Sequence, residues 1–139
     1  MIVLDENILD GQRLMLEGWK IAARQVGLDV GRKGLKDEEI VILLRRLRQP
    51  TFFTRDQGFY SAKLRHQHYA VVVAAVGQYE LAAFVRRLLH HSEFDTFAKR
   101  AGKIIRIALN GITWWQVRRQ QEAFKIWAET LDLYFSTLD

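Results

Sequence analysis

The sequence predicts an α/β fold, a three-layer α/β/α sandwich whose central sheet is mostly parallel and is followed by a C-terminal hairpin plus helix. Two observations favour this class. Short apolar runs typical of strands alternate with helical repeats through residue 100, as in right-handed βαβ units. Residues 70–76 are all alanine or valine, which is expected for a strand buried on both faces of a parallel sheet.

Four elements are predicted before Pro50, in the order strand, helix, strand, helix: residues 1–4, 9–18, 19–26 and 36–48. The first strand is a short apolar run that ends at an acidic pair. The first helix has an apolar repeat and closes at Gly18, and the second strand alternates weakly. The second helix opens with three acidic residues in its first turn, which suit the helix dipole, and Pro50 ends it.

The prediction continues with a strand, a loop containing one helical turn, a strand and two helices: residues 51–53, 57–68, 70–76, 78–91 and 92–102. Residues 103–109 are apolar apart from Arg106 and predict a further strand. Asn110 and Gly111 suit a hairpin turn, and residues 112–117 alternate weakly after it. The last apolar residues have the spacing of an amphipathic helix: Phe124, Trp127, Leu131, Tyr134 and Leu138.

The length of 139 residues suits one domain, with an α/β core at residues 1–110 and a C-terminal strand and aromatic helix at residues 111–139. The absence of cysteine excludes a disulfide scaffold, a thiol nucleophile and a cysteine-ligated zinc site. The longest apolar run has eight residues, and a membrane span needs about 20. We therefore expect a cytoplasmic protein with no membrane partner, and the aromatic last helix predicts a homo-oligomer, such as a dimer.

Basic residues are concentrated in the middle of the chain. The net charge is +5, and residues 51–119 carry eleven basic and four acidic residues. Residues 120–139 carry one basic and four acidic residues. A basic excess of this size fits a polyanionic partner such as nucleic acid, although a solvated basic surface is the alternative.

Acidic residues follow two predicted strands and open one predicted helix. Asp5 and Glu6 follow the first strand, Asp56 follows the third, and Asp37 and Glu38 begin the helix after the second. These positions converge on the edge of the sheet where parallel strands end, and clustered carboxylates repel one another unless a cation lies between them. Oxygen ligands suit Mg²⁺ or Mn²⁺, which can activate water and stabilise charge on a phosphate. For Asp37 and Glu38, the alternative role is to complement the helix dipole.

Three segments together resemble the PIN-like domain family: LDEN at residues 4–7, KDEEI at residues 36–40 and TRDQGF at residues 54–59. The resemblance is closest to its small stand-alone proteins, and the order and spacing agree over residues 1–80. It implies a PIN-like (Rossmann-like) sandwich that binds one or two Mg²⁺ or Mn²⁺ ions. It also implies a ribonuclease that prefers single-stranded RNA, often the toxin of a toxin–antitoxin pair.

The resemblance also implies three metal ligands, which are Asp5, Asp37 or Glu38, and Asp56. Glu6 and Asn7 would lie beside them as further ligands or supporting residues. PIN nucleases usually supply a fourth acid near the start of a later helix, where this chain offers only Gln78 and Glu80. This departure favours an alternative function, a catalytically silent PIN-like module that binds RNA or a protein partner.

The leading prediction is a metal-dependent endoribonuclease in which Asp5, Asp37 and Asp56 are catalytic. Its expected substrate-binding residues are basic, amide or aromatic side chains near the acids: Asn7, Arg32, Lys33, Arg55 and Tyr60. Of these, Arg55 borders Asp56, and Tyr60 offers a ring on which a base can stack. A third interpretation, a phospho-receiver domain, is disfavoured because Lys103 begins its strand and would lie at the wrong edge of the sheet.

Overall fold

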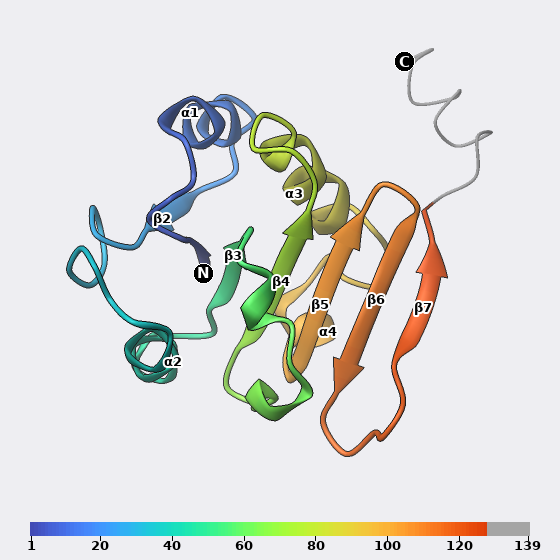
Figure 1. Cartoon of the computed structure of the whole chain (residues 1–139). Helices are drawn as coiled ribbons and strands as arrows, with labels where there is room; N and C mark the ends of the chain where they lie inside the picture. The colour runs from blue at the N-terminus through green and yellow to red at the C-terminus, as the bar shows by residue number, and fades with distance from the viewer. Residues whose placement is uncertain (128–139) are drawn as a thin grey trace, which may run out of the picture.

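A seven-stranded sheet forms the centre of the protein in a computed structural model that describes residues 1–127 (Figure 1). Its strands lie in the order β2 (Ala23–Gln25), β1 (Ile2–Leu4), β3 (Thr51–Thr54), β4 (Ala70–Ala75), β5 (Lys103–Ala108), β6 (Gly111–Gln116) and β7 (Ala123–Ile126). The first five are parallel, whereas β6 and β7 each pair antiparallel with the preceding strand. The predicted α/β class with a mostly parallel sheet is confirmed.

Helical segments cover both faces of this sheet. The helices are α1 (Asp10–Gly18), α2 (Asp37–Arg46), α3 (Leu81–Leu89) and α4 (Phe97–Arg100), and two 3₁₀ turns are η1 (Gln57–Phe59) and η2 (Ala62–Leu64). Apolar residues of α1 and α3 share one core cluster with the sheet, and those of α2 and η1 share a second. The described helices therefore form two layers around the sheet, as expected. Within residues 1–127, no helix is both long and apolar enough to cross a membrane.

The alternation of side chains along β4 explains why its sequence has no polar residue. Val72 and Ala74 belong to the core cluster that contains α1 and α3. Val71 and Val73 belong to the cluster that contains α2. All four side chains are at most 1% exposed, so both faces of this central strand are removed from water.

The prediction that a helix begins near Phe124 is wrong, because residues 123–126 form β7. Ala123 pairs with Trp114 and Lys125 pairs with Ile112, so the segment satisfies backbone groups along the free edge of β6. Gly111 permits this close pairing, since a Cβ at that position would lie 2.6 Å from the carbonyl oxygen of Lys125. The other residues of the expected helix, 128–139, lie outside the described part of the chain.

Two of the later helices are shorter than predicted. The helix expected at residues 78–91 spans Leu81–Leu89, and the one expected at residues 92–102 is the single turn Phe97–Arg100. Thr96 caps this turn, because its Oγ1 accepts a hydrogen bond of 3.3 Å from the backbone N–H of Lys99. The side-chain Nζ of Lys99 also donates a hydrogen bond to the carbonyl oxygen of Ser92. Residues 92–96, which were expected to start the helix, form turns and bends instead.

Candidate functional site

Asp5 lies directly after β1, and only 8% of its surface is exposed. Its Oδ2 accepts a hydrogen bond of 2.6 Å from Oγ1 of Thr54, and its Oδ1 accepts one of 2.8 Å from the backbone N–H of Glu6. Burial raises the pKa of Asp5, these two hydrogen bonds oppose the rise, and the negative charges of Asp56 and Glu6 add to it. The two hydrogen bonds therefore offset only part of the cost of burying the Asp5 carboxylate.

Thr54 connects this carboxylate to the next strand end. Its Oγ1 also accepts a hydrogen bond of 3.0 Å from the backbone N–H of Asp56. The Asp56 carboxylate is exposed and accepts a hydrogen bond of 2.9 Å from the N–H of Gly58 in η1. A cavity of about 270 Å³ lies beside the two strand ends, lined by Asp5, Asn7, Ile8, Arg55 and Asp56. Four residues predicted from the sequence therefore line one cavity.

Asp37 and Glu38 are the first two residues of α2, and they line a separate cavity of about 220 Å³. Partial loss of hydration raises the pKa of Asp37, and the charges of Asp56 and Glu38 raise it further. Asp56 thus acts electrostatically on both Asp5 and Asp37. The three predicted catalytic acids are coupled through Asp56, although they do not line one common cavity.

The loop between β2 and α2 is held by residues that we expected at the site. Oε1 of Glu6 accepts a hydrogen bond of 2.9 Å from the N–H of Gly34. Arg32 forms an exposed ion pair of 2.8 Å with Glu39, and Lys33 is exposed in the same loop. None of Glu6, Arg32 and Lys33 is among the residues that line the Asp5 cavity.

Sequence reasoning missed Gln25, which holds the backbone from Asp5 to Ile8. Gln25 is 4% exposed, and its Nε2 lies 3.1 Å from the carbonyl oxygen of Asp5, 3.3 Å from that of Glu6 and 2.8 Å from that of Ile8. Its Oε1 accepts a hydrogen bond of 3.2 Å from Arg13. A polar residue at the end of a weakly alternating strand was the available signal, but its partners are about 20 residues away in sequence.

The two remaining substrate candidates lie in different surroundings. Nε of Arg55 donates a hydrogen bond of 3.0 Å to the carbonyl oxygen of Val76, and this side chain lines the Asp5 cavity. The hydroxyl of Tyr60 donates to Glu122, in the loop before β7. Burial and this hydrogen bond raise the pKa of Tyr60 to about 12. Tyr60 lines neither of the acidic cavities.

The residues at the Asp5 cavity suit a cation that is held mainly by water and phosphate. Within residues 1–127 no group of three or more histidine and carboxylate side chains is arranged to hold a metal ion. Mg²⁺ commonly takes one or two carboxylates together with waters and substrate phosphates, so the Asp5–Asp56 pair fits that mode. The acid nearest the expected fourth position, Glu80, accepts a hydrogen bond of 3.3 Å from the N–H of Gly77.

Comparisons with known proteins give no relative for this chain. No protein-family model, no curated protein and no solved structure matches it.

Proposed function

We propose that the protein is a metal-dependent endoribonuclease of PIN-like type and acts as the toxin of a toxin–antitoxin pair. One observation carries the proposal: Asp5 and Asp56 are joined through Thr54 and line one cavity at the carboxyl-terminal edge of a parallel sheet. The acidic pair provides oxygen ligands, and Arg55 places a positive charge beside them. The three-segment resemblance to PIN-like domains and the basic middle of the chain support RNA as the substrate.

In this proposal Asp5 and Asp56 would hold Mg²⁺ or Mn²⁺. Asp37 and Glu38 would favour a second cation or a bound water nearby, because the negative charge of Asp56 acts on Asp37 as well. The ion would lower the pKa of water and stabilise charge on a phosphate during in-line attack. Thr54 fixes the orientation of the Asp5 carboxylate, and Gln25 fixes the backbone that carries it. Arg55 would bind a phosphate of the RNA strand, and Asn7, which lines the same cavity, would contact that strand as well.

The test is cleavage of single-stranded RNA by purified protein in Mg²⁺, in Mn²⁺ and in EDTA. We expect cutting only with a metal, and its loss in the Asp5→Asn, Asp56→Asn double variant. Glu17→Gln is the matched control, because it neutralises an exposed acid of α1 outside both acidic cavities. Cutting that persists in EDTA or in the double variant would exclude the proposed site.

A catalytically silent module that binds RNA or a protein partner is the second candidate. It is favoured by the lack, among residues 1–127, of a three-residue metal cluster. This candidate predicts RNA or partner binding that is equal in Mg²⁺ and EDTA, without cleavage in either. Titration of Mn²⁺ into the wild type and into Asp5→Asn distinguishes the nuclease from the silent module. The nuclease should lose metal binding on substitution, whereas the silent module should show no difference between the two proteins. The homodimer remains a prediction that sedimentation can check.

A further inference from the structure

A larger cavity lies at the opposite edge of the sheet from Asp5. Gln116, the last residue of β6, pairs with Lys103, the first residue of β5, so the loop from β6 to β7 extends from the amino-terminal edge of the parallel strands. The cavity beside this loop has a volume of about 510 Å³. Pockets for small ligands span about 300–1,000 Å³, so this space can hold a nucleotide.

Trp114 lines this cavity, and its indole carries a buried donor. Its side chain is 8% exposed and packs edge-to-face on Phe94 at 5.1 Å between ring centroids. Its Nε1 has no hydrogen-bond partner in the described part of the chain. A buried N–H without an acceptor is unfavourable, so the ring would gain a hydrogen bond by turning this N–H toward a ligand that supplies an oxygen or ring nitrogen.

Three cations lie at this cavity or at the cavity next to it. Arg119 lines this cavity, and Gln116 is shared with the neighbouring cavity that Lys103 and Arg118 line. None of these three cations forms an ion pair within residues 1–127. Lys103 also lies over the Trp114 ring, with Nζ 5.9 Å from its centroid.

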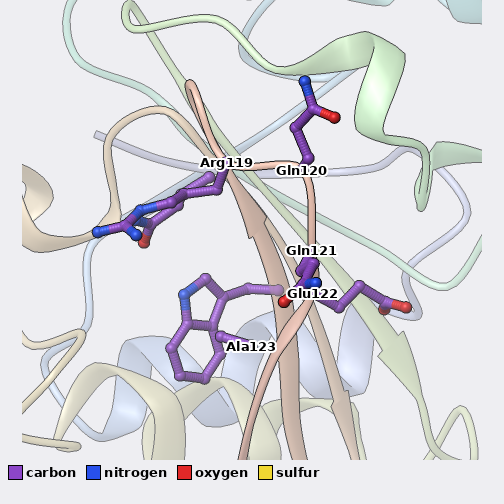
Figure 2. Close-up of a pocket in the computed structure, with 7 residues that line it drawn as sticks. Arg119, Gln120, Gln121, Glu122 and Ala123 are labelled. Atoms are coloured by element: carbon purple, nitrogen blue, oxygen red, sulfur yellow. The ribbon is translucent and has the colours of Figure 1, made fainter.

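The one acid that lines the cavity does not neutralise these cations. Glu122 accepts the hydroxyl hydrogen of Tyr60, and Figure 2 shows the side chains of Arg119 and Glu122 pointing to opposite sides of the loop. The guanidinium is therefore available to a phosphate. The remaining lining side chains include the amides of Gln116, Gln120 and Gln121, which can both donate and accept at the edge of a base.

We propose that this cavity binds one nucleotide unit of single-stranded RNA. The base would accept the Trp114 N–H, a glutamine amide would contact the polar edge of the base, and Arg119 with Lys103 would contact the flanking phosphates. The site lies on the opposite edge of the sheet from the acids and gives the RNA a second contact with the protein. The choice of RNA as its ligand rests on the proposed function. Binding here needs no metal.

The test measures, in EDTA, the fluorescence anisotropy of a labelled single-stranded RNA. An RNA of about ten nucleotides is suitable, because single-strand-binding folds contact about 4–16 nucleotides. We expect Arg119→Gln to weaken binding roughly tenfold and to lower the salt dependence by about one phosphate contact. Arg24→Gln is the matched control, since it removes one exposed charge from β2 at the other side of the sheet, and its effect should stay below about twofold. Trp114→Phe keeps a ring for the core but removes the N–H, and it should weaken binding about fivefold at unchanged salt dependence.

Competition with nucleoside monophosphates shows whether the site takes a free nucleotide or needs a strand. Equal losses for Arg119→Gln and Arg24→Gln, or wild-type binding by a folded Trp114→Phe protein, would overturn the inference. Its failure is distinguishable from that of the nuclease. The Asp5→Asn, Asp56→Asn protein should still lose affinity when Arg119→Gln is added, whether or not the wild type cuts RNA.

Discussion

Replacing Thr54 by valine removes the hydroxyl that joins Asp5 to the backbone of Asp56. The two side chains have nearly the same shape, so no cavity opens at this fully buried position in β3. The substitution deletes the hydrogen bond of 2.6 Å to the Asp5 carboxylate and the bond of 3.0 Å from the Asp56 N–H. It therefore isolates the contribution of one hydroxyl to the acidic site.

The expected loss of unfolding free energy at neutral pH is about 2–4 kcal/mol. A hydrogen bond to a charged group contributes about 1.5–3 kcal/mol, and a neutral one contributes about 1 kcal/mol. Water can replace part of the second bond, because Asp56 is exposed. The Thr54 hydrogen bond holds the pKa of Asp5 down, so its removal raises that pKa further. Between the two folded-state pKa values the variant binds more protons than the wild type, and the stability difference grows as pH rises through this window.

Urea unfolding at neutral and at acidic pH tests this expectation. Thr51→Val is the matched control, because Thr51 is a buried threonine of the same strand whose Oγ1 accepts a hydrogen bond of 3.0 Å from Arg100. The guanidinium stays charged across the acid range, so the loss from Thr51→Val should not vary with pH. A Thr54→Val loss below about 0.5 kcal/mol at neutral pH, or one that is independent of pH, would refute the reasoning.

Three further predictions concern Gln25, Asp5 and Tyr60. Gln25→Leu leaves the carbonyl oxygens of Asp5, Glu6 and Ile8 without their buried donor, and urea unfolding should show a loss of about 2–4 kcal/mol. A loss under about 1 kcal/mol would mean that the amide does not hold this loop. In Asp5→Asn the buried charge disappears. Because burial raises the pKa of Asp5, the folded wild type binds protons more tightly than the unfolded chain. Its stability therefore falls as pH rises from the ordinary aspartate pKa of 3.8 through the raised folded-state pKa. Thermal unfolding should therefore show the variant gaining about 1 kcal/mol at neutral pH and nothing in stronger acid, and a neutral-pH loss would contradict this. Tyr60→Phe should remove, from an ultraviolet titration of the four tyrosines, the phenol that titrates at about 12, and a titration curve unchanged at high pH would show that its pKa is not raised.

The strands and helices that the sequence predicted well are those with strong local patterns. The all-apolar run of β4 and the acidic start with basic end of α2 appear where they were expected. The C-terminal part was harder, because the spacing of Phe124 and Trp127 suits a helix as well as a strand. The free edge of β6 decided that residues 123–126 pair as a strand, and a pattern within one segment cannot report that edge.

The candidate site shows the same division. The sequence predicted that Asp5 and Asp56 follow the first and third strands and converge on one edge of the sheet, and parallel pairing of β1 with β3 makes these strands neighbours. It did not predict Thr54 as their link or Gln25 as the clamp, because these roles depend on contacts between residues about 20 to 49 positions apart. Tyr60 was expected at the RNA, but the structure pairs its hydroxyl with Glu122.

By itself the sequence determined the α/β class, the order of the strands and α-helices from β1 to β6 and the edge of the sheet on which the acids gather, because these follow from local periodicity and strand direction. Tertiary structure alone decided how Asp5, Asp37 and Asp56 are divided between two cavities, and that Trp114 and Arg119 both line a third. The physical reason is that a cavity exists only where separate segments pack incompletely. Its lining and its charge are therefore set by packing between elements and not by the pattern of any one of them.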